Sequence, residues 1–212
     1  MKLSPQEVST LYQQGSLKIA LLGMSNIGKS HFAARLCREF GFKSVEVDSV
    51  IQSKLGKSSM DDHAEWLGQP YSEGYAARAA TAMELETQAA NEAMDICING
   101  DNYVLDAPGS VIYVDAPVLN RLSNEFLNIY VRAEDDDIER LKQLYFTSPK
   151  PLIWKDNYNA LLGSTPHEAV MESYAGLLKS RAENYARLAD ITLDARPLFM
   201  GEIDLKTALG LA

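Results

Sequence analysis

The feature that most constrains the fold of this chain is the segment Gly-Met-Ser-Asn-Ile-Gly-Lys-Ser at residues 23–30. It fits the pattern G-x-x-x-x-G-K-[ST] at every position, and an apolar run over residues 17–22 precedes it. Apolar side chains then recur with helical spacing over residues 29–40, until Gly41 ends the pattern. A buried strand, a tight glycine turn and an amphipathic helix follow one another, which predicts a phosphate-binding loop. The alternative is a strand–turn–helix that contains these residues for packing alone.

The chemistry of phosphate binding accounts for each part of this loop. Glycines let successive backbone N–H groups turn toward phosphate oxygens, and the following helix presents the positive end of its dipole. Lys29 is expected to reach the β and γ phosphates of ATP, while the Ser30 hydroxyl ligates Mg²⁺. The expected nucleotide-binding residues are Gly23, Met24, Ser25, Asn26, Ile27, Gly28, Lys29, Ser30 and His31.

The composition narrows the choice of partner. A formal net charge of −9 argues against nucleic acid or an anionic membrane as the main partner. The sequence has no apolar run approaching ~18 residues and no start that resembles a signal peptide. Cys37 and Cys97 lack metal-ligand or redox spacing and are expected to be buried free thiols. We therefore expect a soluble cytoplasmic protein. We also expect it to act on a small molecule and to be a monomer or a homodimer.

Strands and helices are expected to alternate along the chain. The expected strands cover residues 17–22, 44–47, 102–105, 126–131 and 190–193. The expected helices cover residues 4–14, 29–40, 48–55, 72–97, 134–145 and 165–188, with a tail helix after Pro197. This alternation predicts an α/β fold with a parallel sheet covered on both faces, in one domain over residues 1–212.

Two acidic residues come directly after expected strands. Ligands of open α/β sheets bind beyond the carboxyl ends of the strands, so Asp48 and Asp106 should both lie beside the phosphate loop. Asp106 follows apolar residues, which is the usual setting for an acid that orients Mg²⁺-bound water. The alternatives are a helix N-cap for Asp48 and a plain turn residue for Asp106.

Three further segments share the order and spacing of a known family. Residues 45–56 place acids at a strand end before a short helix and a glycine. Residues 105–113 contain a glycine turn, and residues 177–190 contain an Arg, a Tyr and an Ala-Asp pair before the last strand. Together with the loop and its helix, these segments resemble the shikimate kinase family of P-loop small-molecule kinases over most of residues 17–194.

The resemblance implies a three-layer P-loop NTPase fold with a five-stranded parallel sheet of order 2-3-1-4-5, helices on both faces and a lid over ATP. Residues 146–164 hold Pro, Gly, Asn and Ser with little periodicity, which predicts a mobile loop in the place of that lid. A closing loop would exclude water and bring lysine charge to the phosphates. The alternative is a surface loop without a catalytic role.

The resemblance also implies roles for single residues. Asp48 matches the acid that contacts the acceptor hydroxyl and takes its proton, and Lys150 stands where the lid carries an arginine. The expected catalytic residues are Lys29, Asp48 and Lys150. The expected substrate-binding residues are Asp48, Arg78, Gly109 and Arg181, of which Arg181 matches an arginine that binds the substrate's carboxylate. The expected Mg²⁺ residues are Ser30, Glu46 and Asp106.

The sequence departs from the family pattern at several positions. Glu46 replaces an aspartate, and Lys150 is a point charge in place of a planar guanidinium. The family's Phe-Arg-x-x-Glu signature is not present; Arg78 either replaces its arginine or lies on an exposed helical face.

The leading hypothesis is a kinase that transfers phosphate from ATP to a hydroxyl of a small metabolite, with Mg²⁺. One alternative is a nucleoside or nucleotide kinase, and another is a nucleotide-binding regulatory protein without turnover.

Overall fold

The computed structural model describes residues 3–211 except residues 58, 99, 149 and 161–164. Its sheet consists of strands β1 (Lys18–Leu22), β2 (Lys43–Glu46), β3 (Tyr103–Asp106), β4 (Leu127–Arg132) and β5 (Ile191–Asp194). All four strand pairings are parallel, and the order is β2-β3-β1-β4-β5. The predicted α/β fold with a sheet of order 2-3-1-4-5 is confirmed.

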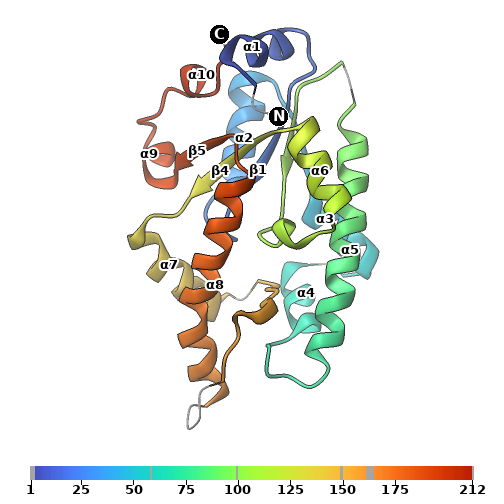
Figure 1. Ribbon diagram of the computed structural model, residues 1–212, viewed down its shortest axis with the longest axis vertical. Helices are drawn as coiled ribbons and strands as arrows, with labels where there is room; N and C mark the ends of the chain where they lie inside the picture. Colours follow the sequence, from blue (N-terminus) through green and yellow to red (C-terminus); the bar gives the residue numbers. More distant parts are fainter. Residues whose placement is uncertain (1–2, 58, 99, 149, 161–164, 212) are drawn as a thin grey trace.

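Helices cover both faces of this sheet and extend beyond its carboxyl edge. The α-helices are α1 (Pro5–Gln13), α2 (Lys29–Phe40), α3 (Val47–Leu55), α4 (Met60–Leu67), α5 (Tyr75–Ile96), α6 (Ala116–Glu125), α7 (Asp135–Thr147), α8 (Pro166–Leu188), α9 (Ala195–Met200) and α10 (Leu205–Ala208). The short 3-10 helices are η1 (Val111–Tyr113) and η2 (Lys155–Asn157). In Figure 1 the long helices α5 and α8 run down opposite sides of the molecule, with α4 between them.

The register of the sheet brings its acidic residues to one edge. In β1, Leu21 lies opposite Asp106 of β3, and Glu46 of β2 lies opposite the same Asp106. The four apolar residues of β1 that follow Lys18 are fully buried, because β1 is the central strand and helices cover both of its faces. The carboxyl ends of β1, β2 and β3 therefore meet at the start of the phosphate loop.

Several element boundaries differ from the sequence-based expectation. The long helix begins at Tyr75 rather than near residue 72, because Gly74 adopts a left-handed conformation before it. The tail helix begins at Ala195 and ends before Gly201, so Pro197 lies in its first turn instead of preceding it. Helices α4 and α6 were not predicted. The Ser59 side chain caps α4 by accepting from the Asp62 N–H, which a Ser at the start of an irregular stretch could have indicated.

The segment predicted as a mobile loop, residues 146–164, is largely packed against the protein where it is described. Helix α7 includes its first two residues, and residues 149 and 161–164 lie outside the described part of the chain. Leu152, Ile153 and Trp154 are buried. The Tyr75 hydroxyl donates to the Leu152 carbonyl at 2.9 Å and accepts from the Trp154 N–H at 3.1 Å. The middle of the segment is thus joined to α5.

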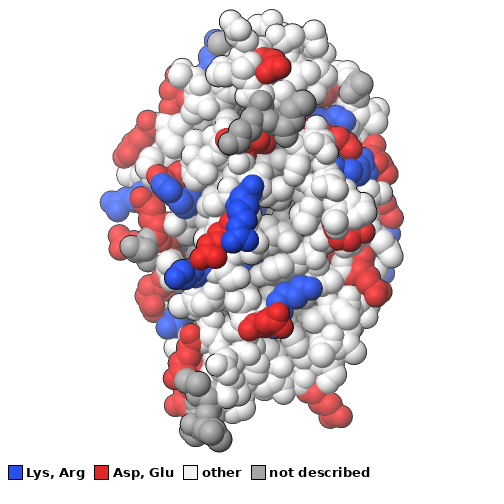
Figure 2. Space-filling model, viewed as in Figure 1, with Lys and Arg blue, Asp and Glu red and all other residues white. Residues whose placement is uncertain are grey.

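Within the described residues, no helix combines the length and apolar character that crossing a membrane requires. On the face shown in Figure 2, acidic and basic side chains lie among each other, and a broad area carries neither charge. Both cysteines are free; Cys97 is buried as expected, whereas Cys37 is only half-buried.

Candidate functional site

The loop between β1 and α2 adopts a shape that its glycines permit. Gly23 has φ 146° and Gly28 has φ 109°, while Asn26 has φ 63°. A Cβ at Gly23 would lie 2.8 Å from the Val131 carbonyl oxygen, which leaves no room for any other residue. The loop then enters α2, whose N-cap is Gly28 and which has no side-chain cap. Its first backbone N–H groups remain available for an anion.

The Lys29 side chain folds back over this loop. Its Nζ donates to the carbonyl oxygens of Gly23 and Met24, each at 3.0 Å, and the residue is only 8% exposed. Burial lowers the pKa of Lys29, and the carboxylates of Asp106 and Asp48 oppose that change. An ammonium group held among backbone carbonyls beside a helix N-terminus is suited to an incoming phosphate.

Two acids, Asp48 and Asp106, act on the charge of Lys29, and a third, Glu46, acts on both of them. Burial raises the pKa of Asp48 to about 6, with Lys29 acting against the rise and Asp106 and Glu46 adding to it. The pKa of Asp106 is also raised by burial, and the charge of Lys29 and a hydrogen bond from the Ser30 hydroxyl oppose the rise. Glu46 is exposed and accepts from the Ser49 hydroxyl at 3.1 Å.

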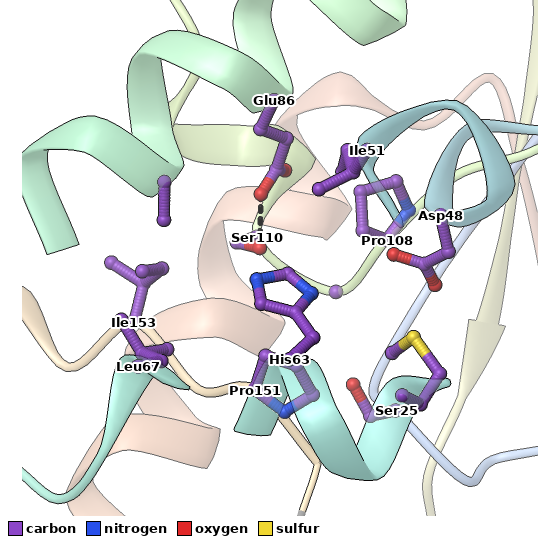
Figure 3. A pocket seen from close by; sticks show the side chains of 13 residues that line it. Ser25, Asp48, Ile51, His63, Leu67, Glu86, Pro108, Ser110, Pro151 and Ile153 are labelled. Carbon is purple, nitrogen blue, oxygen red and sulfur yellow. Dashed lines mark hydrogen bonds between the residues drawn. The ribbon is translucent and has the colours of Figure 1, made fainter. Parts of the chain in front are cut away.

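Asp48 is not the helix cap that the sequence left open. The N-cap of α3 is Glu46, which makes no side-chain cap bond, and Asp48 is the second residue of the helix. Its half-buried carboxyl group is therefore free of a capping role and turns into the pocket beside the phosphate loop (Figure 3).

The described residues suit a metal that is held mainly through water. They form no group of three or more His, Cys, Asp or Glu side chains that could hold a metal ion. The Ser30 hydroxyl and the Asp106 carboxyl are hydrogen-bonded to each other, and Glu46 stands opposite Asp106 in the sheet. One hydroxyl ligand with nearby acids is the donor set expected for Mg²⁺, which keeps several waters and binds few protein groups.

A pocket lies beside Asp48 and the phosphate-loop residue Ser25. Its polar lining consists of Ser25, Asp48, His63, Glu86 and Ser110. Figure 3 shows the Glu86 and His63 side chains entering it from different helices, α5 and α4, on either side of Ser110. Ser110 donates to Glu86 Oε2 at 2.6 Å. Pro151 and Ile153 close another side of the pocket, whose volume is about 30 Å³.

Gly109 and Arg181 meet at the edge of this pocket. A Cβ at Gly109 would lie 3.0 Å from Arg181 Nη1. Arg181 is 2% exposed, donates from Nη2 to the Ile153 carbonyl at 2.9 Å and lies over the Tyr113 ring at 5.5 Å. The residue thus links α8 to the segment that closes the pocket.

The remaining expected site residues occupy different places. The positive charge of Lys150 acts on Asp48, which lies beside the phosphate loop. Arg78 instead donates to the backbone carbonyls of Leu67 and Glu73, so it holds the turns around α4 together and is not part of the pocket lining. His31 is exposed and packs edge-on against Phe199 of α9.

Sequence reasoning did not select Glu86 and His63. Glu86 lies on the buried face of α5 that also holds Ala82, Ala89 and Ala93. An acid that shares a helical face with alanines predicts a buried carboxyl group, and a buried carboxyl group requires a partner. This pattern could have indicated Glu86. His63 lies in α4, a helix that was not predicted, so its neighbours could not be inferred.

The loop, the sheet order and the acids at the strand ends together define a P-loop α/β fold. The sequence itself matches no protein-family model and no curated protein. Among solved structures, the shikimate kinase from Acinetobacter baumannii in complex with shikimate is similar to this chain, with a TM-score of 0.63 and 20% sequence identity. The match covers 97% of this chain and 99% of that chain.

Two other shikimate kinases show the same likeness. The enzyme from Bacteroides thetaiotaomicron is 16% identical, with 84% of this chain and 86% of that chain covered and a TM-score of 0.57. The enzyme from Aquifex aeolicus is 16% identical, with 91% of each chain covered and a TM-score of 0.53. The chain therefore has the shikimate kinase-like fold of P-loop small-molecule kinases.

Proposed function

We propose that this protein transfers the γ-phosphoryl group of ATP, with Mg²⁺, to a hydroxyl group of a small molecule. The observation that carries the proposal is the position of Asp48. Its carboxyl lines the pocket next to the phosphate loop and interacts electrostatically with Lys29. One carboxyl thus faces both the place for a phosphate and the place for an acceptor, as a general base for phosphoryl transfer must.

In the proposed step the acceptor oxygen bonds to the γ-phosphorus, and the bond from that phosphorus to the β–γ bridging oxygen breaks. The hydroxyl proton passes to Asp48, and ADP leaves with the electron pair of the broken bond. A pKa of about 6 leaves Asp48 mostly ionised at neutral pH while making it a better base than an exposed aspartate. Lys29 and the lid residue Lys150 offset negative charge around the transferred group.

The metal has a defined place in this proposal. Ser30 would hold Mg²⁺, with Asp106 and Glu46 orienting its waters, and the ion would neutralise phosphate charge. Ser25 and the loop backbone would position the phosphates, and the residue segment 151–154 would exclude water from the pocket.

The test separates binding from turnover. Isothermal titration calorimetry with Mg·ATP should detect binding to the wild type and none to Lys29→Ala. Coupled detection of ADP across hydroxylated sugars, polyols, acids and nucleosides should find an acceptor that stimulates turnover. Asp48→Asn should retain ATP binding. Its kcat should fall by at least about 100-fold, because a general base typically contributes a rate factor of that size. Equal ATP binding by Lys29→Ala would refute the proposal, and full turnover by Asp48→Asn would refute the role of that carboxyl.

A further inference from the structure

The pocket beside Asp48 contains buried polar atoms that have no partner within the described part of the chain. Both ring nitrogens of His63 and the Oε1 atom of Glu86 are in this state. His63 is 6% exposed and Glu86 is 4% exposed, and both line the pocket. Buried polar atoms of this kind are almost always hydrogen-bonded in proteins, so these three are suited to a bound polar molecule.

The charge of the pocket lining limits what that molecule can be. Its described residues include two carboxyl groups, Asp48 and Glu86, and no lysine or arginine. Burial lowers the pKa of His63 to about 4, with the charge of Lys57 adding to the effect, so the imidazole is neutral at physiological pH. The other polar side chains are the hydroxyls of Ser25 and Ser110, of which Ser110 already donates to Glu86.

The cations that act on these two carboxyls lie outside the pocket lining: Lys29 and Lys150 act on Asp48, and Arg181 and Lys155 act on Glu86. The Arg181 guanidinium has partners, but its Nε atom has none among the described residues. The guanidinium donates to the Ile153 carbonyl, lies over the Tyr113 ring and acts electrostatically on Glu86. Each of the two carboxyls is thus already opposed by cations that do not line the pocket. An acceptor with its own carboxylate or phosphate would bring a further negative charge beside Asp48 and Glu86, and the described pocket lining holds no lysine or arginine to pair with it.

We propose that this pocket binds an uncharged, polyhydroxylated acceptor and discriminates against carboxylic acids, with His63 and Glu86 as the residues that recognise its hydroxyl groups. The inference rests on the proposed kinase function and specifies its acceptor. A neutral imidazole offers one donor and one acceptor, and Glu86 Oε1 offers an acceptor, so each can pair with a hydroxyl without a net charge entering the pocket. The apolar residues Ile51, Leu67 and Ala82 complete a lining suited to a carbon ring or chain.

The first experiment compares acceptors that differ in one group. ADP release would be measured with glucose, glucuronate and glucosamine, and with myo-inositol and quinate, together with ribose, xylitol and glycerol. We expect at least one neutral compound to give turnover above the rate with water. Its kcat/KM should be at least about 100-fold higher than that of the matching acid, glucuronate or quinate, because the pocket would leave the carboxylate without a partner.

A preference for glucuronate, quinate or glucosamine would overturn the inference. The inference would also be overturned if no neutral compound raised the rate of ADP release although ATP bound to the wild type and not to Lys29→Ala. If Mg·ATP does not bind the wild type at all, the proposed function itself fails, which calorimetry reports separately.

The second experiment uses matched variants on α5. Glu86→Gln keeps the shape of the side chain and removes its charge, and Glu84→Gln makes the same change at an exposed position on the same helix. The quantity compared is kcat/KM for the neutral acceptor divided by kcat/KM for the matching acid. We expect Glu86→Gln to lower this ratio by about tenfold, because one nearby negative charge is removed. Glu84→Gln should leave the ratio unchanged. His63→Gln should raise the KM for the neutral acceptor and not the KM for ATP. If the variants raised the KM for ATP and the KM for the acceptor equally, His63 and Glu86 would have a role in packing alone.

Discussion

Gly109 packs directly against Ser25 of the phosphate loop: a Cβ at Gly109 would lie 3.1 Å from Ser25 Oγ and 3.3 Å from Ser25 N. The turn after β3 and the loop after β1 are neighbours because β3 and β1 are paired in parallel. Gly109 also lines the acceptor pocket, and its carbonyl oxygen accepts a hydrogen bond from the Tyr185 hydroxyl. A single glycine therefore sets the spacing between the candidate phosphate and acceptor sites.

The first prediction follows from this contact. Gly109→Ala should raise the KM for both ATP and the acceptor, because the added methyl group pushes the Ser25 backbone and Arg181 apart. The loss in unfolding free energy should be about 1 kcal/mol, typical of a small group inserted into a packed region. Urea denaturation and steady-state kinetics check the two effects. Gly176→Ala is the matched control, because a Cβ there meets no atom within 4 Å. Unchanged kinetics in Gly109→Ala would show that the spacing is not functional.

The second prediction concerns pH. Asp48 must be ionised to accept a proton, and its pKa is raised to about 6, so kcat/KM should rise as pH increases through about 6. The pKa of Glu86 is raised to about 7, so the rise due to Asp48 is measured in the Glu86→Gln background. The rise should be absent from the residual activity of Asp48→Asn. Steady-state rates between pH 5 and 8 provide the measurement, with ATP binding followed at each pH as the control. A midpoint near 4 would show that Asp48 is more solvated than its surroundings indicate.

The parts of the fold that follow from short-range patterns could be predicted from the sequence. The phosphate loop, its flanking strand and helix, and the five strands rest on local spacing of glycine and apolar residues, and the structure has them close to the expected positions. Helix α6 was missed although Asp115 caps it and Pro117 follows, a start signal that lies inside a region without strong apolar periodicity.

The acceptor side of the site depends on tertiary contacts that a linear pattern does not contain. Glu86, His63 and Ser110 come from three separate elements and meet only after α4 and α5 pack beyond the sheet. Arg78 shows the same limit. The sequence left open whether Arg78 replaces the family's arginine or lies on an exposed helical face, and its guanidinium donates to the backbone carbonyls of Leu67 and Glu73. Spacing along a helix cannot tell which side chains the turns around it will engage.

The third prediction concerns the segment that closes the pocket. A volume of about 30 Å³ is close to the share of one water molecule, so the pocket must open before a larger acceptor enters, and we expect Pro151 and Ile153 to move. Trp154 is 1% exposed and packs edge-on against the rings of Tyr145 and Tyr174, so this movement should alter its fluorescence.

Trp66 is the other tryptophan, and Trp66→Phe isolates the signal of Trp154. Addition of a non-hydrolysable ATP analogue with Mg²⁺ and the best acceptor of the panel should change the emission with a saturable dependence on acceptor. The Asp48→Asn variant in the same background should respond more weakly to the acceptor. If neither the ATP analogue nor the acceptor changed the emission spectrum, residues 151–154 would not act as a lid.

The last prediction is a stability effect of Glu86. Burial raises the pKa of this carboxyl to about 7 from an ordinary 4.5, with the Ser110 hydrogen bond opposing the rise. The folded state therefore holds its proton more tightly than the unfolded state between these values. The stability that the protonated carboxyl confers is fully present below about pH 4.5 and is lost as pH rises through about 7.

Glu86→Gln removes this titration while retaining a group that can bond to Ser110. The variant should be more stable than the wild type at pH 8, by on the order of 2 kcal/mol, and the difference should vanish near pH 4. Urea denaturation at both pH values measures it, and Glu84→Gln, exposed on the same helix, should show no such dependence. A Glu86→Gln variant that loses stability at pH 8 would mean that the ionised carboxylate is held in place by Arg181 strongly enough to outweigh its burial.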